Sequence, residues 1–299
     1  MGGLRPDTHI QWVYLTVSDL EKAMKFYTGL LGLKHLSWLG EKVVLGSPDG
    51  EPLIILRERR GALPWPGNSV GLYHLALLMP SRKDLARIFV RISENWGFEG
   101  FSDHIVSEAL YLRDPDGHGL EIYVDRPKSF WSYRSDGGLQ MATLPLNIDS
   151  LLRELAGEGV RLALSNQWRA PAGTRVGHIH LHVSRLEKAE RFYHQLLGFD
   201  VTMRLANSAL FMAVGGYHHH IGANIWAGLD APRASQEHVS LESFSINLMD
   251  IGTISEIKAR IVENGLEVDD GLLNSIEGYS GVTVRDYDGN VVELVAPAR

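Results

Sequence analysis

The sequence predicts an α+β protein made of four repeated units, each containing a strand, a helix and about three further strands. Two pairs of similar segments point to this repeat: LEKAMKFYTGLLGL at residues 20–33 matches LEKAERFYHQLLGF at 186–199, and DPDGHGLE at 114–121 matches DYDGNVVE at 286–293. Self-similarity at a wide, fixed spacing indicates repeated structural units. We place the four units near residues 9–60, 71–127, 176–228 and 241–297.

The elements within each unit follow from local patterns. Residues 13–17 and 179–183 have the alternation and β-branched content of strands. Ser18 and Ser184 follow these strands and are expected to N-cap the next helices, because serine is a favoured cap residue. The Asp-Gly pairs in the second matched motif predict tight turns between strands. The second and fourth units are expected to carry helices over 82–95 and 254–265.

Along the chain, the four units form two pairs. The length of 299 residues suits about two domains of ordinary size. We expect an N-terminal pair of units over 1–127, a connector over 128–175 and a C-terminal pair over 176–299. The connector is aromatic and glycine-rich at 130–138, and its pattern favours a helix at 147–156.

Composition limits the classes of function. The chain has 29 Lys and Arg against 36 Asp and Glu, a net charge of −7, so a nucleic-acid partner is not expected. No apolar run approaches the length of about 20 residues that spans a membrane, and no leader pattern is visible, so we expect a cytoplasmic protein. With 0 Cys and 13 His, any metal must be held by imidazole and carboxylate groups.

The repeated motifs resemble those of the vicinal oxygen chelate superfamily, which includes glyoxalase I, extradiol dioxygenases and bleomycin-resistance proteins. The resemblance covers nearly the whole chain. Together with GHIHLHV at 177–183, GYHHHIGANIW at 216–226 and the segment 103–123, the layout is most similar to the bacterial catechol-2,3-dioxygenase-like branch. It implies that four βαβββ modules form two cupped, mixed β-sheets with metal ligands on the first and last strands of paired modules.

The repeat aligns the ligand positions. The first-strand positions, in module order, are Trp12, His74, His178 and Ser243. The last strands of modules 2 and 4 carry Glu121 and Glu293. If modules 2 and 3 share the site, the ligands are His74, Glu121 and His178. If modules 3 and 4 share it, the set is His178, Ser243 and Glu293, which lacks a histidine, so we favour modules 2 and 3.

The resemblance also implies three residues that act on the substrate. His220 is expected to face the metal, either as a fourth ligand or as the acid/base. Tyr111 lies ten residues before Glu121, as the active-site tyrosine of extradiol enzymes does, whereas the same position in module 4 is Thr283. His104 is expected to join Tyr111 in hydrogen bonding to substrate oxygens.

The function implied is a metal-dependent extradiol ring-cleaving dioxygenase that acts on a catechol-type aromatic with O2. Fe(II) is the expected metal, and Mn(II), Ni(II) or Zn(II) are alternatives. Two other functions stay open: a glyoxalase-like isomerase or lyase, and a non-catalytic protein that sequesters a ligand. The expected partners are a small aromatic substrate and O2, with a homo-oligomer left open.

Overall fold

The computed structural model describes residues 4–135, 138–156, 164–165 and 167–298, and it contains all four predicted modules. Module 1 comprises β1 (His9–Val17), α1 (Leu20–Met24), the π-helical turns η1 (Lys25–Leu30), β2 (Lys34–Leu39), β3 (Lys42–Gly46) and β4 (Pro52–Glu58). Module 2 comprises β5 (Gly71–Leu78), α2 (Arg82–Asn95), β6 (Gly100–Asp103), β7 (Ser107–Arg113) and β8 (Gly119–Asp125).

The second half of the chain repeats this plan after the connector. The connector holds the short helices η2 (Lys128–Phe130), α3 (Ile148–Leu152) and η3 (Arg153–Leu155). Module 3 comprises β9 (Arg175–His182), α4 (Leu186–Ala189), the π-helical turns η4 (Glu190–Leu197), β10 (Asp200–Leu205), β11 (Ala209–Ala213) and β12 (Ile221–Asn224). Module 4 comprises β13 (Leu241–Asn247), α5 (Ile251–Glu263), β14 (Val268–Asp270), β15 (Tyr279–Arg285) and β16 (Val291–Pro297).

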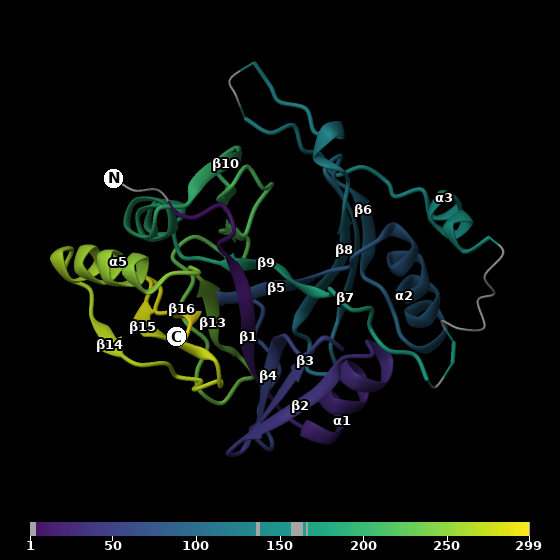
Figure 1. Cartoon of the computed structure of the whole chain (residues 1–299), viewed down its shortest axis with the longest axis horizontal. Helices are drawn as coiled ribbons and strands as arrows, with labels where there is room; N and C mark the ends of the chain where they lie inside the picture. The colour runs from purple at the N-terminus through teal and green to yellow at the C-terminus, as the bar shows by residue number, and fades with distance from the viewer. Residues whose placement is uncertain (1–3, 136–137, 157–163, 166, 299) are drawn as a thin grey trace.

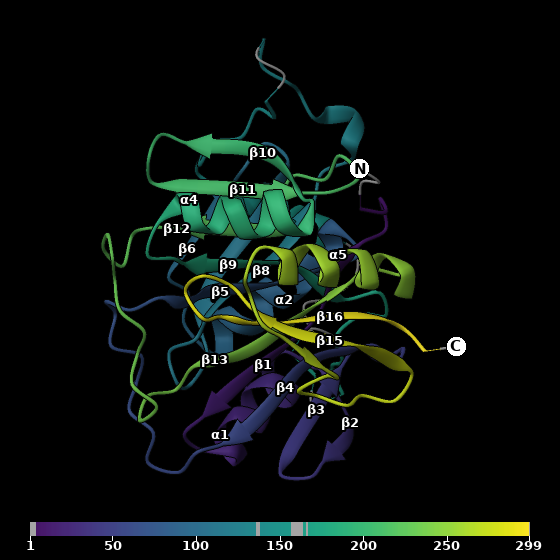
Figure 2. The ribbon, with the colours of Figure 1, turned by 90° about the vertical axis from the view of Figure 1, so that its left-hand side faces the viewer.

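The modules combine into two eight-stranded mixed sheets, and each sheet takes one module from each half of the chain (Figure 1). Modules 3 and 2 form the sheet β10-β11-β12-β9-β5-β8-β7-β6, and modules 4 and 1 form β14-β15-β16-β13-β1-β4-β3-β2. Figure 2 shows β10 and β11 in the upper part of the molecule and β2 and β3 in the lower part. The halves 1–127 and 176–299 therefore describe the order along the chain, not the sheets.

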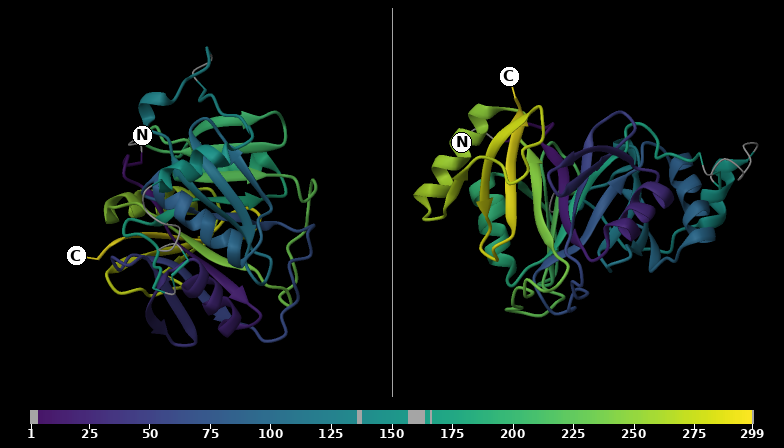
Figure 3. Two further views of the ribbon diagram at one scale, coloured as in Figure 1. Left: turned by 90° about the vertical axis from the view of Figure 1, so that its right-hand side faces the viewer. Right: turned by 90° about the horizontal axis from the view of Figure 1, so that it is seen from below.

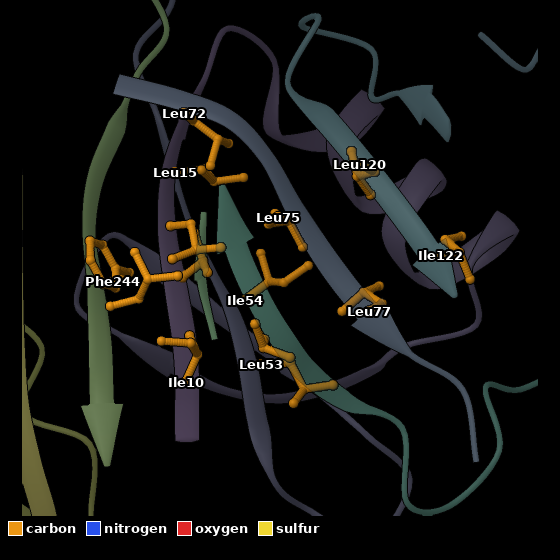
Figure 4. Packing of buried hydrophobic residues seen from close by; sticks show 14 of the residues in the cluster. Ile10, Leu15, Leu53, Ile54, Leu72, Leu75, Leu77, Leu120, Ile122 and Phe244 are labelled. Carbon is orange, nitrogen blue, oxygen red and sulfur yellow. The ribbon is translucent and has the colours of Figure 1, made fainter. Parts of the chain in front are cut away.

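Both sheets contribute to one hydrophobic core. Along β5, Leu75 and Leu77 lie in this core, whereas His74 between Tyr73 and Leu75 points to the opposite face. Figure 4 shows side chains of β5, β8, β1 and β13 gathered in the core. The face away from the core is the concave one that carries the ligand positions. We call the concave face of modules 2 and 3 the first cup and that of modules 1 and 4 the second cup.

The repeated motifs tie the modules of each half together. The Tyr27 hydroxyl donates to Asp114 at 2.9 Å, and the Tyr193 hydroxyl donates to Asp286 at 2.8 Å. Each bond joins the tyrosine of a Phe-Tyr motif to the first aspartate of an Asp-x-Asp-Gly turn. The motifs thus recur because they form the same contact between neighbouring modules.

The predicted serine caps are wrong. Ser18 and Ser184 instead donate to Asp116 and Asp288 of the same two turns. Asp19 caps α1 by accepting from the Lys22 amide at 2.9 Å, and the α4 cap position has no side-chain hydrogen bond. The serines belong to the contacts between modules rather than to the helix ends.

The connector leaves the end of β8 and projects from the body of the molecule, as the teal segment in Figure 1 and the left panel of Figure 3 shows. Helices α3 and η3 lie where the sequence pattern favours a helix. Among the described residues, no helix is long and apolar enough to cross a membrane.

Candidate metal centre

Three predicted ligands meet in the first cup. His74 comes from β5, Glu121 from β8 and His178 from β9, and all three side chains are buried. The Oε2 atom of Glu121 lies 3.1 Å from His74 Nε2 and 3.2 Å from His178 Nε2, and the two Nε2 atoms are 3.3 Å apart. The structure thus brings together the set that pairs modules 2 and 3.

These distances fit a single divalent ion. Ligand atoms that each lie about 2.1 Å from one ion are roughly 3.0 to 3.4 Å apart at octahedral or tetrahedral angles. Two imidazoles and one carboxylate are donors that suit divalent iron, manganese, nickel or zinc. The donor set and its spacing therefore suit a metal without any rearrangement of the strands.

The pKa values of Glu121 and His178 also favour metal binding. Burial alone would raise the pKa of Glu121, but His178 and His74 prevail and hold that pKa well below its usual value. Burial lowers the pKa of His178 to about 4. An ionised carboxylate and a neutral imidazole are the forms that bind a metal ion.

The fourth aligned position of the site carries no ligand side chain. Glu121 lies opposite Ala76 in the strand register, two residues beyond His74. The equivalent residue in module 3, opposite His180, is Gly222. A Cβ atom at Gly222 would lie only 2.8 Å from the His180 ring, so that ring covers the glycine. The strand register thus supplies three protein ligands and places a glycine at the fourth position.

The predicted position of His220 is corrected by the structure. Strand β12 begins at Ile221, so the run of histidines lies before the strand and does not follow its alternation. The ring of His220 packs against Tyr217 and Phe199, with ring centroids 4.8 and 6.2 Å away. His220 is not among the described residues that line the cavity of the first cup.

His219 takes the place predicted for His220. It lines the cavity, and its ring centroid lies 4.1 Å from that of His178. The carboxylate of Asp125 accepts from His218 Nε2 at 2.9 Å, so a neutral His218 has its lone pair on Nδ1. That atom accepts from Nδ1 of His219 at 2.8 Å. These partners leave Nε2 of His219 as its proton-accepting atom.

Tyr111 and His104 form a pair in the same cavity. His104 Nδ1 donates to the carbonyl of Ala142 at 2.8 Å, so Nε2 of the neutral ring accepts from the Tyr111 hydroxyl at 2.7 Å. Burial, with the nearby Glu121 carboxylate, raises the pKa of Tyr111 well above its usual value. Tyr111 is thus a phenol whose oxygen lone pairs are available to another donor.

The cavity itself has a volume of about 440 Å³. His74 and Glu121 line it, together with Tyr111, His104 and His219. The other lining residues come from modules 2 and 3 and from the connector: Tyr73, Ser102, Ser107, Arg134, Met141, Ala142, Thr143, His180, Met203, Arg204, Leu205, Phe211 and Trp226. The connector had no predicted role, because its sequence carries no repeat from which to place it.

The second cup holds no comparable cluster among the described residues. Its Glu293 accepts from Ser243 Oγ at 2.8 Å, from Trp12 Nε1 at 3.2 Å and from both the backbone and side-chain nitrogens of Asn274, at 2.9 and 2.8 Å. The carboxylate is fully buried and fully hydrogen-bonded. Asn274 could not be predicted from the repeat, because it lies in a loop, 271–278, that has no counterpart of equal length in module 2.

Comparison with known proteins agrees with this architecture. The model of the glyoxalase, bleomycin resistance protein and dioxygenase superfamily matches residues 9–122 and 175–294. The chain belongs to this superfamily. A catechol-2,3-dioxygenase of Bacillus subtilis (strain 168) is 40% identical over 272 residues, which cover 90% of this chain and 93% of that protein.

Solved structures share the fold at low sequence identity. A protein of Bacillus subtilis subsp. subtilis str. 168, provisionally described as a dioxygenase, superposes with a TM-score of 0.65 at 12% identity, over 97% of this chain and 86% of its own. Glyoxalase I from Zea mays gives a TM-score of 0.56 at 15% identity, over 97% and 92% of the two chains. These neighbours confirm the α+β fold with two cupped sheets.

Proposed function

We propose that this protein is an extradiol ring-cleaving dioxygenase that acts on a catechol-type aromatic with O2 and uses Fe(II). The observation that carries the proposal is the buried group of two histidines and one glutamate, with no ligand at the fourth aligned position and a cavity that His74 and Glu121 line. Such a face with free positions is typical of non-haem Fe(II) oxygenases. The 40% identity to a catechol-2,3-dioxygenase over nine-tenths of the chain supports it.

In this proposal His74, Glu121 and His178 hold the metal. Bound Fe(II) would supply neighbouring coordination positions for both reactants, so that proximity and orientation contribute to the rate. The chain's own residues then bind the substrate and move its protons. The Tyr111 oxygen accepts a hydrogen bond from a substrate hydroxyl while its own proton stays on the bond to His104.

His219 is the proposed acid/base, in place of His220. Its Nε2 atom accepts a proton from the substrate, because Nδ1 already donates to His218. Asp125 holds His218 in the tautomer that this requires. A positioned histidine contributes roughly 10²- to 10⁴-fold to such reactions.

The fourth aligned position also bears on the glyoxalase-like alternative. A fourth protein ligand would favour isomerase or lyase chemistry. The register instead places Gly222 at that position, and His220 does not line the cavity. Three protein ligands beside a cavity support the dioxygenase.

The test is oxygen consumption by metal-loaded protein. Protein stripped of metal is reloaded separately with Fe(II), Mn(II), Ni(II) or Zn(II) and mixed with catechol in an oxygen electrode cell. We expect the Fe(II) form to consume one O2 per catechol, with a coloured ring-opened product and no added reductant. His74→Ala serves as the control without a complete ligand set. If the Fe(II) form consumes no O2 with any of a panel of catechols, the proposal fails.

A further inference from the structure

The cavity of the first cup is much larger than its metal-binding end requires. Its volume of about 440 Å³ lies in the range that holds a drug-sized ligand. A catechol is a single six-membered ring whose two oxygens must lie at the triad. Most of the cavity would then remain for something attached to the ring.

Part of the cavity wall is apolar. Met203 and Leu205 come from β10, Phe211 from β11, Trp226 from the loop after β12, and Met141 from the connector. These five side chains carry no group that would hydrogen-bond a polar substituent, apart from the indole nitrogen of Trp226. Their chemistry favours an apolar ligand surface.

Two of these side chains are exposed. Leu205 is 48% exposed and Trp226 is 47% exposed. Covering apolar surface of this kind is favourable in proportion to the area removed from water. A ligand that contacts both would remove apolar surface from water.

A second cavity adjoins that of the first cup. It has a volume of about 450 Å³ and shares Met203, Arg134 and Arg204 with it. Arg204 forms an ion pair with Glu190 at 2.5 Å, so its charge already has a protein partner.

We infer that the natural substrate is a catechol with an apolar substituent of several carbon atoms, alkyl or aryl, which lies against Met141, Met203, Leu205 and Trp226. Met141 makes the connector a specificity-determining segment. The inference depends on the proposed function only for the catechol ring itself. The apolar wall is a property of the cavity whatever reaction takes place at the triad.

The test measures binding without turnover. Fe(II)-loaded protein is titrated calorimetrically, without O2, with catechol, 4-tert-butylcatechol, 3-phenylcatechol and the acidic analogue 3,4-dihydroxybenzoate. A single added methylene in an apolar pocket is worth about tenfold or more in discrimination. We therefore expect at least one of the two apolar compounds to bind at least about tenfold more tightly than catechol, and 3,4-dihydroxybenzoate to bind no more tightly than catechol.

Single substitutions test which residues produce the preference for the apolar compounds. Met141→Ala and Leu205→Ala should each reduce the preference for the apolar compounds while the affinity for catechol changes little. Leu144→Ala is the matched control, because Leu144 is an exposed connector residue that does not line the cavity. It should keep the preference.

The outcomes separate the two proposals. Equal affinity for catechol and the apolar compounds, or tightest binding of 3,4-dihydroxybenzoate, would overturn the inference. So would a preference that neither Met141→Ala nor Leu205→Ala reduces. An apolar preference in protein that consumes no O2 would support the inference while the dioxygenase proposal fails.

Discussion

The two cups share a strand register but not a chemistry. In the first cup the aligned positions hold His74, His178 and Glu121, and the carboxylate lies 3.1 and 3.2 Å from the two imidazoles. In the second cup Glu293 occupies the position of Glu121, but four donors surround it.

The difference shows how a buried carboxylate can be satisfied in two ways. Burying a charged group is costly unless partners compensate for the lost water. The first cup supplies imidazoles that an ion can bridge, whereas the second supplies neutral N–H and O–H donors that bond both carboxylate oxygens. One scaffold thus yields a candidate metal centre and a hydrogen-bonded structural centre.

The largest expected effect comes from removing a ligand of the first cup. His74→Ala should reduce the metal content from about one ion per chain to near zero and abolish activity, because two ligands hold the ion too weakly. Ser243→Ala changes the aligned position in the second cup and should leave the metal content unchanged. Elemental analysis of both variants is the measurement. An unchanged metal content in His74→Ala would refute the assignment of the centre to modules 2 and 3.

The next effect separates the two neighbouring histidines. His219 lies three residues before Gly222, and the second cup has Pro52 three residues before Ile55, so only the first cup carries a proton acceptor there. His219→Gln should lower kcat about 100-fold or more. His220→Gln should change kcat by less than about fivefold. Steady-state kinetics with Fe(II)-loaded protein measures kcat for both variants. Equal losses of kcat in the two would contradict the assignment of His219 as the acid/base.

A third comparison tests the structural role of the second cup. Glu293→Ala leaves the Trp12 indole, the Ser243 hydroxyl and the Asn274 backbone amide without their acceptor, which should cost about 3 kcal/mol of unfolding free energy. Urea denaturation measures this loss, and the metal content per folded chain should not change. Glu277→Ala, in the same loop as Asn274 but exposed, is the control. A loss of metal in Glu293→Ala would erase the distinction between the cups.

The smallest effect concerns acid stability. Burial lowers the pKa of His178 to about 4 and that of His220 to about 3. The unfolded chain therefore binds protons from about pH 6.5 downward that the folded chain does not, so stability falls as the pH falls through this window. Each such histidine lowers the free energy of unfolding by about 1.4 kcal/mol for each pH unit that the pH falls between about pH 6 and its pKa in the folded protein.

This slope can be checked on metal-free protein by urea denaturation between pH 7 and pH 5. His220→Asn should make the decline shallower, because the residue that titrates is gone. His35→Asn, at an exposed position, should leave the slope as it is. If His220→Asn has the same slope as the parent protein, His220 is not held neutral by burial.

The repeat made most of the fold and of the candidate metal centre predictable from the sequence. The four modules follow from the matched motifs, and the aligned positions led to His74, Glu121 and His178. Alternation along regular strands carries such an argument, because it fixes which side chains share a face. Tyr111 followed from its spacing to Glu121, and the two residues indeed lie opposite each other in the β7–β8 register.

The errors lie where regular strands end. His218 to His220 precede β12, so strand alternation could not decide between His219 and His220. The loop that carries Asn274 and the connector that carries Met141 have no repeat partner of equal length. Their positions depend on long-range packing, which no local pattern in the sequence encodes.

The tyrosine–aspartate contacts have a consequence for how the chain holds together. Module 1 is bound to module 2 through Tyr27, module 2 to module 3 through β5 and β9, module 3 to module 4 through Tyr193, and module 4 to module 1 through β13 and β1. The four modules therefore form a closed ring. Cutting the chain between its halves would break no link of this ring, whereas separating the halves would break both sheets and divide the metal centre. A split version of the protein should regain its site only when the two fragments reassemble.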